Sequence, residues 1–128
     1  MRGKMRILTV DDEQDILDIL SDCLESTGHE VVQALNGEQA MEQLRQNGPF
    51  DLILTDLSMP VMCGRQLIEK ARAAGIKTEI VVVSTGDVPA DERQRLNIKM
   101  VINKPFRLDE LSEHLSGLVT CNNTPQRD

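Results

Sequence analysis

The sequence predicts an α/β fold in which five short parallel strands alternate with helices in one three-layer domain. Short apolar runs rich in Val and Ile recur along the 128 residues, and amphipathic stretches separate them. Strands that are joined by helices form parallel sheets with right-handed crossovers. Several of the runs are nearly continuously apolar, which is typical of strands that helices cover on both faces. These observations predict a single-domain (βα)5 sandwich.

Five segments have the length and composition of strands, and helical periodicity marks the segments between them. The predicted strands cover residues 6–10, 30–34, 51–55, 79–84 and 99–103. The apolar stripes that predict helices are Ile16, Leu20, Cys23 and Leu24; Met41 and Leu44; Leu67 and Ala71; and Leu108, Leu111, Leu115 and Leu118.

Glycines mark the ends of the first three predicted helices. Gly28, Gly48 and Gly75 follow the stripes at the position where a left-handed residue commonly ends a helix. The fourth predicted helix, within residues 88–96, has few apolar residues and is shorter than the roughly 12–15 residues that an isolated helix needs. We therefore expect it to be the weakest element of the fold.

The composition limits the classes of function. The formal net charge is −7, whereas nucleic-acid binders cluster Lys and Arg on the surface that meets the phosphates. We expect no signal peptide, and no apolar run of the sequence approaches the roughly 20 residues that span a bilayer. Cys23, Cys63 and Cys121 lack the spacing of a zinc site or a disulfide framework. We expect a cytoplasmic protein that binds neither membranes nor, directly, nucleic acid.

Polar and charged residues gather where the predicted strands end. Asp11 and Asp12 follow the first strand, and Asp56 follows the third. Ser84 ends the fourth strand, and Lys104 follows the fifth. The carboxyl ends of parallel strands meet at one edge of the sheet, where the sites of open α/β folds lie. We therefore expect these five residues to lie together.

Each of these residues also has an ordinary explanation, as a turn residue, an acidic helix start or a surface charge. Together they are harder to explain in that way. Two unit charges about 4 Å apart interact by roughly 4 kcal/mol at an effective dielectric constant of about 20, so three crowded carboxylates repel strongly. Mg²⁺ relieves this repulsion, since it prefers oxygen and binds one or two carboxylates together with water and phosphate. The cluster predicts a magnesium site.

The remaining groups suit phosphoryl chemistry. Carboxylates can take up phosphoryl groups as aspartyl-phosphates, which makes Asp56 a candidate nucleophile. The ammonium group of Lys104 can contact one phosphoryl oxygen, and the Ser84 hydroxyl can donate a hydrogen bond to another.

Four segments resemble the signature segments of response-regulator receiver domains. They are VDDE (10–13), DLILTDLSMPVMCG (51–64), VVVST (81–85) and NKPF (103–106), in the order and with about the spacing of that family. The resemblance covers residues 5–119 and leaves residues 120–128 as a polar tail, which we expect to be disordered. It implies a flavodoxin-like fold with the strand order 2-1-3-4-5.

The resemblance also implies a metal site. Asp56 would be the phosphoacceptor, and Mg²⁺ would be bound by Asp12, Asp56 and the main-chain carbonyl of Ser58. Asp11 would hold a metal-bound water. Strand alternation places Asp11 and Asp12 on opposite faces, so their spacing alone leaves open which of the two is the direct ligand.

By the same resemblance, Ser84 is the switch hydroxyl and Lys104 contacts the phosphoryl group. The implied phosphodonor is a histidine kinase or a phosphotransfer protein, and the downstream effector stays open. Such a domain is a conformational signalling switch rather than an enzyme, because it catalyses only its own phosphorylation and slow dephosphorylation.

Two features depart from the family pattern. Val101 lies three residues before Lys104, where receivers commonly have an aromatic side chain whose rotation reports phosphorylation. The stretch from Ser84 to Lys104 is also slightly short, which predicts a truncated fourth helix. We expect activation to be read from residues 85–96, because a β-branched valine has little rotameric freedom.

Two other classes of function stay open. A pseudo-receiver would keep the fold as a docking module with little phosphorylation-dependent output. A small aspartyl-phosphate hydrolase or phosphotransferase would have a second Asp two residues after the nucleophile as general acid, and here that residue is Ser58. The sequence also leaves open whether the chain is a stand-alone regulator or a fragment of a larger protein.

Overall fold

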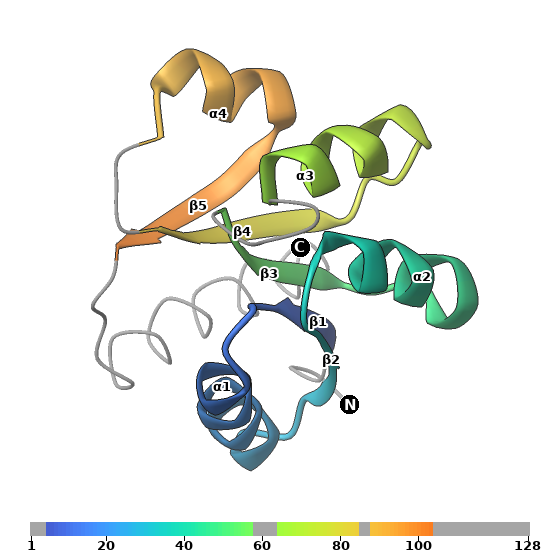
Figure 1. Ribbon diagram of the computed structural model, residues 1–128, viewed down its shortest axis with the longest axis vertical. Coiled ribbons are helices and arrows are strands. Elements are labelled where there is room, and N and C mark those ends of the chain that lie inside the picture. Colours follow the sequence, from blue (N-terminus) through green and yellow to red (C-terminus); the bar gives the residue numbers. More distant parts are fainter. Residues whose placement is uncertain (1–4, 58–63, 85–87, 104–128) are drawn as a thin grey trace, which may run out of the picture.

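The central feature of the fold is a five-stranded parallel sheet in the order β2-β1-β3-β4-β5 (Figure 1). The computed structural model of the protein describes residues 5–57, 64–84 and 88–103. Its strands are β1 (Arg6–Val10), β2 (Glu30–Ala34), β3 (Leu52–Asp56), β4 (Glu79–Ser84) and β5 (Ile98–Asn103). The predicted strand order is confirmed.

Helices cover both faces of this sheet. They are α1 (Gln14–Ser26), α2 (Gly37–Asn47), α3 (Gly64–Ala73) and α4 (Ala90–Leu96). Figure 1 shows α1 on one face and α2, α3 and α4 on the other, which gives the three predicted layers. The predicted last helix, with its leucine stripe from Leu108 to Leu118, and the predicted tail 120–128 lie outside the described residues.

Two aliphatic clusters form the core, one on each face of the sheet. The cluster beside α2, α3 and α4 contains Leu8, Ile53, Ile80, Leu67 and Leu96, among others. The cluster beside α1 contains Ile7, Leu20, Leu24, Leu52 and Leu54, among others. Successive β3 residues alternate between the clusters, as the pleat of a strand requires. All five residues of β3 are buried, so this strand holds the two layers together.

The position of β3 differs slightly from the prediction. The strand covers Leu52–Asp56 instead of residues 51–55, and Asp56 pairs with Val83 of β4. Asp56, the phosphoacceptor candidate, is therefore the last residue of β3 and not the first residue of a loop. This placement restricts its backbone through pairing with a neighbouring strand.

Two of the three glycine predictions are confirmed and one is wrong. Gly28 and Gly75 have φ angles of 96° and 86°, which fits the left-handed helix ends that were expected. Gly48 ends α2 with φ −69° and ψ 169°. The next residue, Pro49, has no backbone N–H, so it cannot donate the hydrogen bond that closes a left-handed helix end.

The helix α4 is short, as predicted. It has seven residues, of which only Leu96 is buried, and it ends at Asn97 in the left-handed conformation with φ 57°. Asparagine tolerates this conformation better than most residues with a side chain. The strand that follows, β5, pairs with β4 through one register shift, which leaves Lys99 without a partner between Ile98 and Met100.

Among the described residues, the helices are all too short or too polar to cross a membrane.

A buried histidine joins the start of β1 to the start of β2. His29 is 9% exposed, and its Nδ1 accepts a hydrogen bond of 3.0 Å from the backbone N–H of Met5. Burial lowers the pKa of His29 below the usual 6.5. Protonation of Nδ1 would remove this acceptor, so the hydrogen bond and the burial both favour the neutral imidazole.

This histidine makes the stability depend on pH. Because its pKa is lower in the folded state than in the unfolded chain, its contribution is present above pH 6.5 and is lost as the pH falls through the folded-state pKa. We expect the free energy of unfolding of the parent, measured with urea, to fall more steeply than that of His29→Gln as the pH is lowered. Glutamine retains a hydrogen-bond acceptor but does not titrate. A difference between the two proteins that is constant with pH would contradict this.

Candidate functional site

The end of β1 brings two aspartates to the carboxyl edge of the sheet. The backbone N–H of Asp11 donates to the carbonyl oxygen of Ala34 in β2 at 3.1 Å, which continues the ladder by one residue. The Asp11 carboxylate, only 2% exposed, accepts a hydrogen bond of 2.9 Å from the backbone N–H of Glu13. This bond turns the chain from β1 into α1, whose first turn has no other side-chain cap.

The ordinary explanation of the acidic pair is therefore correct in part. Asp11 acts as a turn residue, as aspartates often do before a helix. One of its oxygens serves the backbone, and the carboxylate remains beside two others. The role in the turn and the role in an acidic cluster are compatible in one residue.

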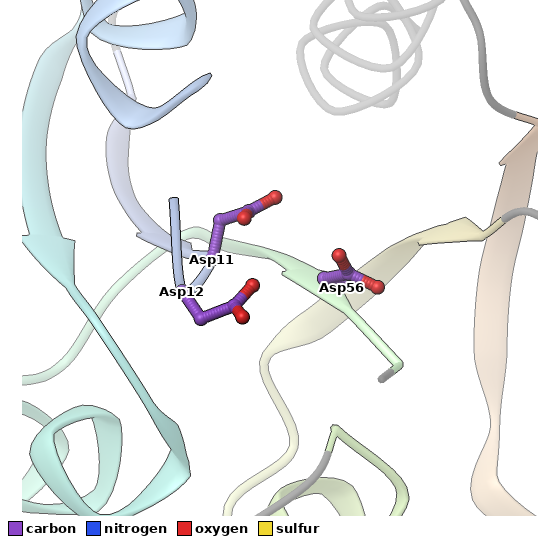
Figure 2. Close-up of side chains that lie close together, drawn as sticks. All are labelled: Asp11, Asp12 and Asp56. Carbon is purple, nitrogen blue, oxygen red and sulfur yellow. The ribbon is translucent and has the colours of Figure 1, made fainter. Parts of the chain in front are cut away.

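Three carboxylates meet between the ends of β1 and β3. One oxygen from each of Asp11, Asp12 and Asp56 lies within 4.8 Å of the other two. Figure 2 shows the side chains of Asp11 and Asp12 leaving the end of β1 on the side that faces Asp56. Asp11 and Asp56 are buried and Asp12 is exposed. The cluster is therefore open to solvent on the side of Asp12.

This arrangement has the chemistry of a divalent cation site. All the donors are carboxylate oxygens, the hard ligands that Mg²⁺ and Ca²⁺ prefer. Two of the carboxylates are held by regular structure, Asp56 by the β3–β4 pairing and Asp11 by its backbone bonds. The repulsion between them is therefore not relieved by a simple rotation of the chain, and a cation would relieve it.

The other predicted residues fall into two groups. Ser84 is 7% exposed and is the last residue of β4, one position beyond the Val83 that pairs with Asp56. It thus lies at the same edge of the sheet as the aspartates. Ser58 and Lys104 lie outside the described residues, so their predicted roles stay predictions. Val101 is described, and it packs partly buried in the core beside α4.

Sequence reasoning missed the close packing of Gly64 on the end of β3. The backbone N–H of Gly64 donates to the carbonyl oxygen of Leu57 at 2.9 Å. A Cβ atom at this position would overlap the carbonyl oxygen of Asp56 and lie 2.8 Å from the Cα of Leu57. The glycine that ends the segment DLILTDLSMPVMCG was the available signal, since glycine allows two backbones to approach closely.

Comparison with known proteins identifies the family. The model of the response regulator receiver domain matches residues 7–116. The chain therefore belongs to the response-regulator receiver domain family, as the four sequence segments and the strand order predicted.

Curated relatives include response regulators and sensor kinases. Two-component response regulator ORR41 of Oryza sativa is 38% identical over 93 residues, which cover 70% of this chain and 73% of ORR41. Transcriptional regulatory protein DltR of Streptococcus agalactiae is 31% identical, with 84% of this chain and 48% of DltR covered. Sensor histidine kinase TmoS of Ectopseudomonas mendocina is 34% identical, with 90% of this chain and 12% of TmoS covered. The chain thus spans less than half of DltR and a small part of TmoS.

Solved structures agree with this fold. A CheY-like receiver domain protein from Methanospirillum hungatei superposes with a TM-score of 0.83 at 27% identity, covering 94% of this chain and 97% of that one. The response regulator TrrA from Thermotoga maritima, solved in complex with Mg²⁺–BeF, has a TM-score of 0.76 at 29% identity, covering 92% and 99%.

The carboxylate cluster predicts the response of the fold to metal. In chelator, Asp12→Asn should raise the melting temperature, with a gain of about 1 kcal/mol or less because Asp12 is exposed and solvent screens its charge. Mg²⁺ should raise the melting temperature of the parent and do so less in Asp12→Asn. The control is Asp22→Asn, an exposed aspartate of α1 outside the cluster, which should respond to Mg²⁺ like the parent. Equal responses of all three proteins would refute the metal site.

The packing of Gly64 predicts a second effect. Gly64→Ala should cost roughly 1–3 kcal/mol, as over-packed sites do, and should weaken the stabilisation by Mg²⁺ because it displaces the backbone of Asp56. Gly28→Ala is the matched control, since its positive φ costs about 1–2 kcal/mol without any neighbouring atom within 4 Å. Urea unfolding with and without Mg²⁺ measures both effects. If Mg²⁺ stabilises Gly64→Ala as much as the parent, the substitution does not displace the end of β3.

Proposed function

We propose that the protein is a phosphorylated signalling switch that accepts a phosphoryl group on Asp56 from a histidine kinase or a phosphotransfer protein. The observation that supports this most is the position of Asp56 at the end of β3, buried and within 4.8 Å of two further carboxylates. A structural aspartate has no need of such neighbours. Membership of the receiver family supplies the reaction class.

The proposed transfer moves one phosphoryl group between two protein side chains. A carboxylate oxygen of Asp56 forms a bond to phosphorus as the bond between phosphorus and the donor imidazole nitrogen breaks. The electron pair of the broken bond stays on that nitrogen, and the imidazole leaves as a neutral ring that keeps the proton on its other nitrogen or takes one from water. Water later attacks phosphorus, which releases inorganic phosphate and restores the carboxylate. Because little covalent chemistry is required of the protein, positioning and charge neutralisation account for most of the catalysis.

Mg²⁺ is the proposed cofactor. When bound, the ion neutralises charge on the phosphoryl oxygens and on the carboxylates that surround them. The donor set of Asp11, Asp12 and Asp56 fits a hard cation. We propose Asp12, Asp56 and the main-chain carbonyl of Ser58 as direct ligands, with Asp11 holding a metal-bound water. The Mg²⁺–BeF complex of TrrA is consistent with this in a relative.

The remaining groups would act on the phosphoryl oxygens. Ser84 is the proposed switch hydroxyl, and its place at the carboxyl edge beside β3 supports that role. Lys104 is the proposed cationic contact. We propose that the domain spans residues 5–119, works in the cytoplasm, and acts through an effector protein without binding nucleic acid itself.

Phosphorylation of Asp56 can be measured directly. The protein is incubated with acetyl phosphate and Mg²⁺, and the intact mass should increase by one phosphoryl group per chain. Asp56→Asn should remain unlabelled, because an amide is not a nucleophile for this transfer. Chelation of Mg²⁺ should suppress the labelling of the parent.

The same experiment separates the alternatives. Asp22→Asn is the control variant and should be labelled like the parent, since Asp22 lies on α1 away from the cluster. No labelling of the parent would favour a docking module without phosphorylation. Release of phosphate from many equivalents of a small phosphodonor, far above the rate for the protein's own aspartyl-phosphate, would favour a hydrolase.

A further inference from the structure

The helix α4 depends on α3 for its position. It has seven residues and one buried side chain, Leu96, and a helix of this length is unstable without tertiary contacts. Its other contacts with the described part of the chain include polar side chains of α3. We call these contacts the α3–α4 ladder, formed by Arg65, Glu69 and Arg72 on α3 with Glu92, Arg95, Leu96 and Asn97 at α4.

The α3 members of the ladder lie on one face of the helix, because they are four and three residues apart. Arg65 Nε is 2.5 Å from Glu92 Oε2, and Glu69 Oε2 is 3.4 Å from Arg95 Nη1. The Arg72 guanidinium donates to the carbonyl oxygens of Leu96 and Asn97, both at 3.0 Å.

The Arg72 end of the ladder is an anchor. Its guanidinium also donates to the carbonyl oxygens of Ile76 and Thr78 at 2.9 Å each, so one side chain joins the end of α3, the turn after it and the end of α4. Burial lowers the pKa of Arg72, and the negative charge of Glu79 opposes this effect. Arg72 thus ties two carbonyl oxygens at the end of α4 to two in the turn after α3, and this end of α4 has little freedom to move.

The Arg65 end is different, because its contact with α4 is an ion pair between two side chains and does not involve backbone carbonyl oxygens. The Glu92 side chain is 15% exposed and the Arg65 side chain 44% exposed. The Glu69–Arg95 pair is longer and exposed on both sides, and such pairs contribute little. The Arg65–Glu92 pair is therefore the contact of the ladder that can transmit a displacement to the first turn of α4.

The Arg65 end of the ladder is also the end next to Asp56, the proposed phosphoacceptor. Gly64, the residue before Arg65, donates its N–H to Leu57 and packs against the carbonyl oxygen of Asp56 with no room for a Cβ atom. Closely packed backbones transmit a displacement rather than absorb it. A movement of Asp56 and Leu57 thus reaches Glu92 through Gly64 and Arg65.

We propose that α3 transmits the phosphorylation state of Asp56 to α4, with Arg65–Glu92 as the moving contact and Arg72 as the pivot. This inference rests on the proposed function and adds a route for its output. It differs from a route through Ser84 and the residue at position 101, where Val101 is too small and stiff to report a change by rotation.

The test compares backbone amide NMR shifts with and without beryllium fluoride and Mg²⁺. In the parent, the phosphoryl mimic should shift the amides of Ala90–Leu96, and the changes should be largest in the first turn. In Arg65→Gln we expect these changes to lose roughly half of their size, because the moving contact is gone. The exchange Arg65→Glu with Glu92→Arg should restore them. The control is Arg45→Gln, which removes an ion pair of the same length within α2 and should leave the changes intact.

The outcomes separate this inference from the function on which it rests. Mass spectrometry with acetyl phosphate is run on every variant. If Arg65→Gln is phosphorylated and its α4 amides shift as in the parent, the α3 route is wrong and the proposed function stands. The same holds if the charge exchange fails to restore the shifts. If the parent is not phosphorylated, the proposed function itself fails.

Discussion

Mutual repulsion of three carboxylates is the constraint to which the rest of this structure is adapted. Asp11 and Asp56 are buried, and the cluster exists because β1 and β3 are adjacent and end at the same edge. Parallel pairing, the burial of β3 on both faces and the backbone bonds of Asp11 all hold the charges close. The core thus provides the free energy that keeps an unfavourable charge arrangement in place, and a cation bound there would relieve the repulsion.

Much of the fold could be predicted from the sequence because its elements obey simple local rules. The strands β1, β2 and β4 have the predicted bounds, since each begins at a charged residue (Arg6, Glu30 or Glu79) that precedes a short, largely apolar run. The exact end of β3 could not be predicted, because Asp56 is unfavourable in a strand and is held there by pairing with Val83. The conformation of Gly48 was mistaken for a similar reason: the deciding residue was its neighbour, Pro49, which has no N–H to close a left-handed helix end.

Some features of the candidate site could likewise be predicted from the sequence, and others could not. The convergence of Asp11, Asp12 and Asp56 follows from parallel topology and could be predicted, and Ser84 lies at the expected edge. The close approach of Gly64 to Asp56 and the contacts between α3 and α4 could not, because they depend on how helices dock in three dimensions. Periodicity assigns a residue to a helix face but does not give its partner on another helix.

The register shift in β5 has a consequence for how molecules of this protein meet one another. In the described sheet β5 is an edge strand, and an edge offers unpaired N–H and C=O groups to any strand that approaches. The extra residue, Lys99, interrupts the regular spacing of those groups and adds an exposed positive charge at the same place. A strand from a neighbouring molecule would have to match an irregular ladder and bury a lysine, so the edge resists the sheet-to-sheet growth that leads to aggregates.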